Sequence, residues 1–306
     1  MPSDVVQKLW RILNMDQVLK DRVALITGAG GGIGQAVAVA FAREGARLVL
    51  ADRNAEKLDK TAALSRETGA MAIAIRTDIA QRDQVQHLVA KALKEWGQVN
   101  VLVNSAGVYG PIGPTVNVDL DAWVQGLNIN LVGPLFLFQA LLPHMQQQRQ
   151  GKVILLGGGG VTNPLPNLSC YAASKAGLAR LADTLAEELK EFNVQINVIA
   201  PGLVDTRLQD EVLAAGSQAG PLYEKIKEAR EKGTGAVPPE VAASLAVFLA
   251  SEASGTLTGK LIAAPYDPWK QWQGQAEKLN STPLYTIRRL DPFTIKPLIA
   301  SLEQMM

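Results

Sequence analysis

The sequence has few of the residues that disulfide bonds and zinc sites require. Its 306 residues include a single cysteine, Cys170, and two histidines, His87 and His144, which lie 57 positions apart. One cysteine excludes an intramolecular disulfide framework, and two distant histidines do not form the closely spaced ligand pairs of zinc sites. We therefore expect chemistry that uses no metal, in a cytoplasmic protein.

Long hydrophobic runs and an excess of one charge are also lacking. The longest apolar stretch, residues 131–142, is far shorter than the roughly 20 residues that span a bilayer. The N-terminal residues lack the basic-then-apolar pattern of a signal peptide. Lys and Arg total 30 against 29 Asp and Glu, which argues against nucleic acid or an acidic membrane as a partner. With 47% apolar residues, a soluble globular protein that binds a small molecule is expected.

Glycine and aromatic residues are unevenly distributed along the chain. Nine of the 27 glycines fall in two short runs, Gly28–Gly34 and Gly157–Gly160. Such clusters are typical of backbone that approaches another group closely. Five of the 16 aromatic residues lie in the last 42 residues, which suggests a tail that packs onto a surface.

From Asp21 onward, short β-branched runs alternate with longer helical patterns, as in a parallel sheet with crossover helices. The predicted strands are 22–27, 47–52, 71–76, 99–104, 152–157, 195–200 and 260–264. The predicted helices include 33–44, 82–96, 120–145, 171–191 and 239–250. Right-handed crossovers then predict an α/β fold, a single doubly wound parallel sheet of about seven strands with helices on both faces. Residues 1–20 form a predicted helical extension, 21–264 one domain, and 265–306 a C-terminal extension.

The first glycine run joins a predicted strand to a predicted helix. There the backbone of Gly28–Gly34 can approach a pyrophosphate, and the amide groups that begin the helix point at it. Asp52 ends the next strand, about 20 residues further on, where an acid hydrogen-bonds a ribose 2′-hydroxyl. Its charge would repel a 2′-phosphate, which favours NAD over NADP, although Arg53 softens that preference. The alternatives are a ligand-free turn and a surface acid.

At this point the sequence resembles the short-chain dehydrogenase/reductase family, in its single-domain form with a Rossmann-type nucleotide-binding sheet. The resemblance covers about residues 20–264 and rests on motifs in family order. These are Thr27–Gly34 as Thr-Gly-x-x-x-Gly-x-Gly, Asp78, Asn104-Ser105-Ala106-Gly107, Asn130, Tyr171-x-x-x-Lys175, and Pro201-Gly202 with Thr206. The resemblance implies an NAD(P)-dependent oxidoreductase that acts on CH-OH groups.

The resemblance also implies which residues bind the cofactor. Asp78 would contact the adenine, Asn104–Gly107 would line the adenosine ribose, and Thr206 would hold the nicotinamide carboxamide. Taken alone, Asp78 is also compatible with a helix cap, Asn104 with a strand-end hydrogen bond, and Pro201-Gly202 with a turn. The full expected set is Gly28, Gly30, Gly32, Ile33, Gly34, Asp52, Arg53, Asp78, Ile79, Asn104, Ala106, Gly107, Tyr171, Lys175, Pro201, Gly202, Val204 and Thr206.

Hydride transfer at a carbinol carbon requires a group that gives or takes a proton near neutral pH. Tyrosine, with an ordinary pKa of about 10, needs a nearby cation to act as a base. Tyr171 and Lys175 are four apart on a predicted helix and so share one face. By resemblance Lys175 also binds the nicotinamide ribose, and Asn130 supports a water-linked proton path. The alternative is a buried aromatic beside a solvated charge.

One position departs from the family. Its catalytic serine, 13 residues before the tyrosine, is Gly158 here. Three explanations stay open: Thr162 or Ser169 supplies the hydroxyl, a glycine amide or water donates instead, or the protein is a catalytically weak NAD(H)-binding sensor or scaffold. Ser169 is alternatively the N-cap of its helix. The four-glycine run also suggests room for a bulkier, sugar-like or ring alcohol.

The remaining expectations concern the substrate pocket, the tail and assembly. The segment 207–237 is predicted to be a specificity loop, and Tyr109, Trp123 and Tyr223 are pocket candidates, with plain packing as the alternative. The tail is expected to dock over the pocket or onto a neighbouring subunit. The apolar helices 120–145 and 171–191 correspond to those through which the family forms dimers and tetramers, so a homodimer or homotetramer is expected.

Overall fold

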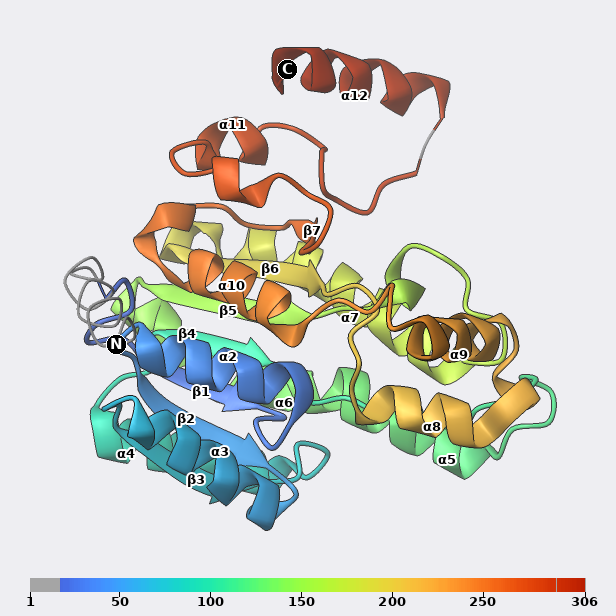
Figure 1. Ribbon diagram of the computed structural model, residues 1–306. Coiled ribbons are helices and arrows are strands. Elements are labelled where there is room, and N and C mark those ends of the chain that lie inside the picture. The colour runs from blue at the N-terminus through green and yellow to red at the C-terminus, as the bar shows by residue number, and fades with distance from the viewer. Residues whose placement is uncertain (1–16, 290, 306) are drawn as a thin grey trace, which may run out of the picture.

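The computed structural model describes residues 17–289 and 291–305. A seven-stranded parallel sheet forms its centre, in the order β3-β2-β1-β4-β5-β6-β7 (Figure 1). The strands are β1 (Val23–Thr27), β2 (Arg47–Asp52), β3 (Ala72–Arg76), β4 (Val101–Asn104), β5 (Gly151–Leu156), β6 (Val194–Ala200) and β7 (Leu261–Ala263). The predicted fold class is confirmed, and the predicted strands agree with the observed ones to within two residues at each end. The predicted helical extension, residues 1–20, lies outside the described residues except for residues 17–20, which lead into a turn.

Helices cover both faces of the sheet and enclose two apolar cores. One face carries α2 (Gly32–Arg43), α3 (Ala55–Glu67) and α10 (Pro239–Ala250), which bury apolar side chains in one core. The other carries α4 (Arg82–Trp96), α6 (Gly133–Gln148) and α7 (Ser169–Glu188), with a second core beneath them. The strand order reverses between β1 and β4, and that switch point is where doubly wound sheets bind ligands.

Several predicted helix boundaries are confirmed by their local chemistry. The helices α4 and α10 have the predicted bounds. Gly97 ends α4 with a φ of 71°, in the left-handed region, and Pro239 begins α10, where a missing N–H costs nothing. The helix predicted over 171–191 begins at Ser169 and ends at Glu188, followed by a 3-10 turn, Lys190–Phe192.

The prediction of a single helix over 120–145 is wrong. The segment is divided into α5 (Leu120–Leu127), a π-helical turn (Asn128–Val132) and α6. The Asn130 side chain within this turn is fully buried and bonds the loop that follows β4. The π turn inserts an extra residue while the apolar pattern continues through it, so periodicity alone does not reveal the break.

The continuous run Leu120–Gln148 is, among the described residues, the one helical stretch long and apolar enough to cross a membrane by length and composition. Within it, Leu137, Leu141 and Met145 are fully buried in the second core, against the sheet. We therefore interpret this run as a core helix.

The segment 207–237, predicted to be a specificity loop, is mostly helical. It contains two helices, α8 (Arg207–Ala215) and α9 (Pro221–Lys232), joined by a 3-10 turn, Gly216–Ala219. Apolar side chains from both helices, Val212 and Ile226, are fully buried in a third, smaller cluster. The segment is therefore a folded wall beside the carboxyl ends of the strands (Figure 1).

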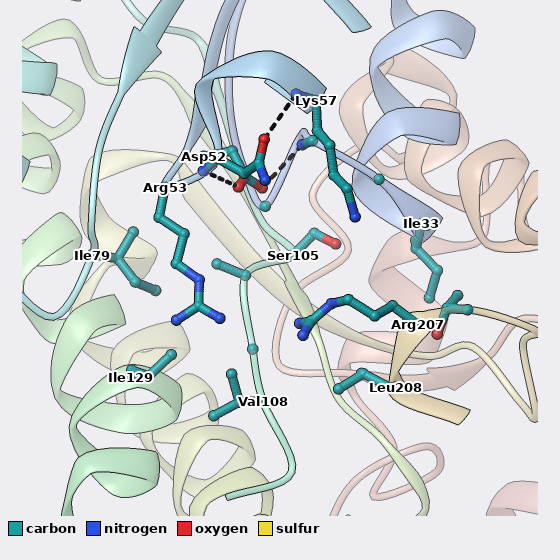
Figure 2. Close-up of a pocket in the computed structure, with 18 of the residues that line it drawn as sticks. Ile33, Asp52, Arg53, Lys57, Ile79, Ser105, Val108, Ile129, Arg207 and Leu208 are labelled. Atoms are coloured by element: carbon teal, nitrogen blue, oxygen red, sulfur yellow. Dashed lines mark hydrogen bonds between the residues drawn. The ribbon is translucent and has the colours of Figure 1, made fainter. Parts of the chain in front are cut away.

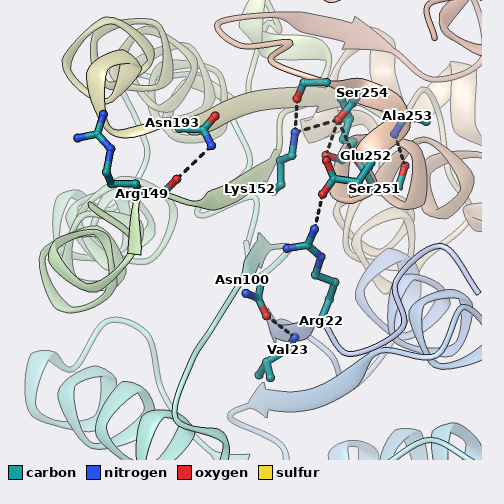
Figure 3. A network of polar contacts seen from close by, with 12 residues as sticks. Arg22, Val23, Asn100, Arg149, Lys152, Asn193, Ser251, Glu252, Ala253 and Ser254 are labelled. Atoms are coloured by element: carbon teal, nitrogen blue, oxygen red, sulfur yellow. Dashed lines mark hydrogen bonds and ion pairs between the residues drawn. The ribbon is translucent and has the colours of Figure 1, made fainter. Parts of the chain in front are cut away.

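A polar network ties the opposite, amino end of the sheet together (Figure 3). Arg22 pairs with Glu252, and Lys152 on β5 donates to the Ser254 hydroxyl at 3.2 Å and to the carbonyl of Gly255. Burial lowers the pKa of Lys152 to about 8. The network fixes the turn after α10 at the end of the sheet remote from the switch point.

The first part of the tail packs against the chain's own sheet. Trp269, Trp272 and Leu279 join the first core, and α11 spans Ala276–Asn280 (Figure 1). The Lys260 ammonium is buried and donates to three tail carbonyls at 2.7, 3.0 and 3.1 Å. The N–H of Leu261 donates to Tyr285 at 2.7 Å, so the tail covers the outer edge of β7. The last helix, α12 (Pro292–Met305), instead exposes apolar side chains.

Two aromatic residues of the tail allow a matched test of this packing. Trp272 is 2% exposed and Phe293 is 88% exposed. Trp272→Ala leaves a cavity in the first core and is expected to lower the free energy of unfolding by about 3–5 kcal/mol. Phe293→Ala is expected to change it by less than about 0.5 kcal/mol. Urea denaturation measures both, and equal effects would contradict the described packing.

Candidate active site

A cavity of about 470 Å³ opens at the carboxyl ends of the strands, at the switch point (Figure 2). Its walls come from the loops after β1, β2, β3 and β4 and from the start of α8. In parallel pairing, Thr27 at the end of β1 lies between Ala51 on β2 and Asn104 on β4. The loops that follow these strands therefore face one another across the cavity.

The glycine run after β1 is required by contacts that leave no space for side chains. A Cβ on Gly34 would lie 2.1 Å from the Gly28 carbonyl oxygen, and one on Gly28 would lie 2.6 Å from the Ala106 amide nitrogen. Gly28 also has a φ of 66°, which other residues rarely adopt. By contrast, Gly31, at the N-cap of α2, faces open space. The loop thus presents bare backbone and the start of a helix to the cavity, an arrangement that suits a phosphate.

The Asp52 carboxylate is fixed at the cavity wall by two backbone donors. Its Oδ2 accepts from the Gly30 N–H at 3.0 Å, and its Oδ1 accepts from the Asn54 N–H at 2.9 Å. Each carboxylate oxygen can accept more than one hydrogen bond, so both Asp52 oxygens can also accept a hydrogen bond from a ligand hydroxyl. A Cβ on Gly30 would lie 2.8 Å from Cγ of Asp52, so this contact also requires glycine.

Three basic side chains face the same cavity. In Figure 2, Arg53, Lys57 and Arg207 extend into it from the loop after β2, from α3 and from α8, respectively. Arg53 was predicted from the sequence. Lys57 and Arg207 were not, because a lysine or arginine in the first turn of a polar helix resembles a solvated charge. Their positions just after Asp52 and Thr206 were the available signal.

Most predicted cofactor residues line the cavity, and a second group lies outside its wall. The lining includes Gly28, Gly30, Gly32, Ile33, Asp52, Arg53, Asp78, Ile79, Ala106, Gly107 and Thr206. The predicted residues outside the lining are Gly34, Asn104, Tyr171, Lys175, Pro201, Gly202 and Val204. Gly31 and Ser105, which fall within the predicted stretches Gly28–Gly34 and Asn104–Gly107, line it as well, and the lining residues that were not predicted are Asn54, Lys57, Thr77, Val108, Ile129, Arg207 and Leu208. A bare glycine loop for a pyrophosphate and a fixed carboxylate for ribose hydroxyls fit a nicotinamide dinucleotide.

Two predicted residues also have structural partners. The Asp78 carboxylate accepts from the Ala80 N–H at 3.0 Å and so supports the turn before α4. Asn104 accepts from the Thr27 hydroxyl at 2.9 Å and ties β4 to β1. Its Nδ2 is buried without a partner among the described residues. The helix-cap alternative for Asp78 is wrong, because Gln81 is the N-cap of α4. The strand-end hydrogen bond of Asn104 holds alongside any contact with a cofactor.

Tyr171 and Lys175 lie one turn apart on α7, as their spacing predicts. Lys175 is only 3% exposed, so it is not a solvated charge; its Nζ donates to the Leu156 carbonyl at the end of β5 at 2.8 Å. That Nζ lies 5.8 Å from the centroid of the Tyr171 ring. Burial lowers the pKa of Lys175 to about 8 and raises the pKa of Tyr171.

Asn130 holds the loop after β4 against α7. Its Nδ2 donates to the Val108 carbonyl at 2.8 Å and to the Ser174 hydroxyl at 2.9 Å. Its Oδ1 accepts from the Val108 N–H at 2.9 Å. The side chain is therefore fully used in positioning this loop beside Tyr171 and Lys175, and a water-linked proton path from Asn130 stays a prediction.

The Tyr171 side chain lies close to position 158. A Cβ on Gly158 would lie 2.3 Å from the Tyr171 hydroxyl oxygen, so a side chain there would require that ring to move. Nearby, a Cβ on Gly160 would lie 2.6 Å from Cα of Ala172, and one on Gly157 would lie 2.9 Å from a Val198 methyl. The expectation that this run admits a bulkier substrate stays a prediction.

The two hydroxyls considered as substitutes are engaged elsewhere. Thr162 is exposed, and its Oγ1 accepts from the Asn163 side chain at 3.0 Å. Ser169 is the first residue of α7, and its Oγ accepts from the Trp123 indole N–H at 3.1 Å. The prediction that Ser169 is the N-cap is wrong, because Leu168 occupies that position and no side chain caps the helix.

The aromatic pocket candidates take different positions. Tyr109 is buried, and its ring contacts that of Tyr171 edge-to-face with centroids 4.8 Å apart. Tyr223, on α9, packs half-buried against the same third cluster.

The described tail residues do not line the cavity, so the expectation that the tail covers it is wrong for them. Within the same part of the chain, no group of three or more His, Cys, Asp or Glu residues is arranged to hold a metal ion.

Comparison with known families and curated proteins agrees with this geometry. The family model for short chain dehydrogenases matches residues 22–216. The chain is 33% identical over 258 residues to the 3-oxoacyl-acyl-carrier-protein reductase FabG of Thermotoga maritima, covering 80% of this chain and 96% of the relative. It is 35% identical over 253 residues to cis-4-hydroxycyclohexanecarboxylate dehydrogenase of Sinomonas cyclohexanicum, covering 81% and 97%.

Solved structures are similar over the same region. An NAD⁺-bound xylitol dehydrogenase matches with a TM-score of 0.74 and 27% identity, over 80% of this chain and 98% of that one. An actinorhodin polyketide ketoreductase with NADPH matches with a TM-score of 0.73 and 26% identity, over 79% and 95%. Both nicotinamide cofactors therefore occur among similar structures.

The buried ammonium of Lys175 predicts how stability depends on pH. Between pH 8 and 10.5 this lysine is neutral in the folded protein and charged in the unfolded chain. The unfolded chain then binds more protons, so the free energy of unfolding rises with pH by up to about 1.4 kcal/mol per unit from this group. Urea denaturation of the wild type and Lys175→Met across this range measures the difference between them, which is expected to grow in favour of the wild type. A constant difference would contradict burial of the ammonium.

Proposed function

Because this chain belongs to the short-chain dehydrogenase/reductase family of oxidoreductases, which act on hydroxyl or carbonyl groups with a nicotinamide cofactor, we propose that it interconverts a secondary alcohol and a ketone with NAD. The observation that carries the proposal is the buried pair Tyr171 and Lys175 on α7, beside a loop that also forms the cavity wall.

Different residues of this chain would have different roles in the reaction. The nicotinamide, when bound, would accept the hydride from the alcohol carbon or return it to the ketone. Tyr171 would take the hydroxyl proton during oxidation and give it back during reduction. The nearby Lys175 ammonium favours the phenolate form of Tyr171 and so opposes the effect of burial. Asn130 would hold the Val108 loop in place beside both.

The preference for NAD rests on Asp52. Its fixed carboxylate would accept hydrogen bonds from ribose hydroxyls and repel a 2′-phosphate. Arg53, Lys57 and Arg207 act against this preference, because each would attract a phosphate. We propose that Asp52 prevails, since it is held by two backbone donors while the basic side chains are long and flexible.

The proposed substrate is a ring or sugar-like alcohol. Support comes from the names of similar proteins, a dehydrogenase of a hydroxycyclohexane carboxylate and a xylitol dehydrogenase. We further propose a cytoplasmic homodimer or homotetramer. The exposed Leu120, Val124 and Leu135 on α5 and α6 suit a subunit interface better than a solvated surface.

The second candidate function is a catalytically weak NAD(H)-binding sensor or scaffold, which Gly158 favours. A panel of sugar, cyclic and acyclic secondary alcohols with NAD⁺, followed by NADH absorbance, separates the two. Turnover supports the enzyme; cofactor binding without turnover of any alcohol or of the matching ketones supports the sensor.

Tyr171→Phe tests the proposed proton-transfer group. The variant keeps the buried ring and removes the hydroxyl, so turnover is expected to fall by about 100-fold or more while NADH affinity is retained. Tyr266→Phe, at an exposed tail residue, serves as the matched control and is expected to retain wild-type turnover. A Tyr171→Phe variant with wild-type turnover would refute the assignment.

A further inference from the structure

The proposed reaction needs a second hydrogen-bond donor that position 158 does not supply. Negative charge builds on the substrate oxygen as its proton leaves, and a fixed donor aimed at that oxygen stabilises the charge. Gly158 has no side chain, and a Cβ there would lie 2.3 Å from the Tyr171 hydroxyl oxygen, so a side chain would require the Tyr171 ring to move. Thr162 and Ser169 have other partners.

Tyr109 has a hydroxyl group and contacts the ring of Tyr171. It follows β4 by five residues, on the loop that Asn130 fixes through Val108. Its ring meets that of Tyr171 at 67°, with centroids 4.8 Å apart, and it is 8% exposed. Apolar side chains of the third cluster, including Val212 on α8 and Leu168, surround both rings. The ring of Tyr109 is therefore held by packing, as a preorganised donor requires.

The hydroxyls of Tyr109 and Tyr171 are both available to a ligand. Neither has a hydrogen-bond partner among the described residues, and neither is among the polar atoms sealed from solvent. The two hydroxyls are carried by rings in contact with each other and both reach solvent, so a polar ligand atom can hydrogen-bond to either of them.

The charge state of Tyr109 suits a donor. Burial and the carboxylate of Glu211 raise the pKa of Tyr109 to about 12, so its hydroxyl keeps its proton at neutral pH. Burial raises the pKa of Tyr171 as well. The Lys175 ammonium, 5.8 Å from the centroid of the Tyr171 ring, opposes this effect, so Tyr171 is the better candidate for giving up its proton.

We propose that the Tyr109 hydroxyl donates a hydrogen bond to the substrate oxygen, in the role that a side chain at position 158 would fill, so that Tyr109 and Tyr171 hold the reacting oxygen between them. This inference rests on the proposed function. During oxidation the proton of the alcohol passes to Tyr171, and Tyr109 keeps its own.

The test compares Tyr109→Phe with Tyr285→Phe, a tyrosine of the tail that packs against Trp272. With NAD⁺ and the best alcohol of the panel, Tyr109→Phe is expected to lower kcat by about 100-fold, the typical effect of losing one such donor. Its NADH affinity and Tm are expected to match the wild type, because the ring and its packing remain. Tyr285→Phe is expected to leave kcat unchanged.

A binding measurement completes the test without turnover. The probe is 2,2,2-trifluoroethanol, an alcohol that resists oxidation, titrated into the protein with NAD⁺. Loss of one neutral hydrogen bond in Tyr109→Phe is expected to weaken its binding by about twofold to tenfold. Wild-type kcat and probe affinity in Tyr109→Phe would overturn the inference alone, provided that Tyr171→Phe is inactive. A wild-type protein without turnover of any alcohol would overturn the proposed function and this inference together.

Discussion

At the two glycine runs the backbone packs closely against neighbouring backbone and side chains, and the arrangement of the site depends on these contacts. In the first glycine run, Gly34 lies against the Gly28 carbonyl, and Gly28 lies against the loop after β4. In the second, Gly158 lies against the Tyr171 hydroxyl and Gly160 against the backbone of α7. Each contact fixes a helix or a loop against the carboxyl end of a strand. A methyl group at Gly28, Gly34 or Gly160 would press against backbone and force these elements apart, whereas one at Gly158 would press against the Tyr171 ring.

The chemistry of the site follows from these contacts. The first run aligns α2 on β1 and leaves backbone N–H groups facing the cavity beside Asp52. The second lets α7 approach β5 closely enough for the Lys175 ammonium to reach the Leu156 carbonyl. Tyr171 is carried by the same helix, so its hydroxyl lies beside Gly158, next to Tyr109. Burying the Lys175 cation without an acidic partner among the described residues lowers the stability of the fold. In the proposed function, the same cation would stabilise the Tyr171 phenolate.

Much of the fold could be predicted from the sequence, because strands buried on both faces and amphipathic helices have distinct apolar periods. The glycine loop and Asp52 were predictable for a similar reason, since their spacing reflects local strand-turn-helix geometry. The π turn at Asn130 was not, because an extra residue in a continuously apolar run leaves the pattern unchanged. Lys57 and Arg207 were missed because only the tertiary structure directs them into a cavity.

The surroundings of Gly158 could not be predicted from the sequence either. The pattern showed that a hydroxyl was missing, and it suggested added space for the substrate. The closeness of position 158 and Tyr171 is a tertiary contact between the loop after β5 and α7, which no local pattern encodes. Likewise, Tyr109, on the loop after β4, contacts Tyr171 on α7, 62 residues further along the chain.

NADH is expected to bind in the site that the glycine loop and Asp52 form. Calorimetric titration of the wild-type protein with NADH and with NADPH compares the two affinities. NADH is expected to bind at least about tenfold more tightly, a difference of about 1.4 kcal/mol. Tighter binding of NADPH, or no binding of either, would refute the assignment of this site to NAD.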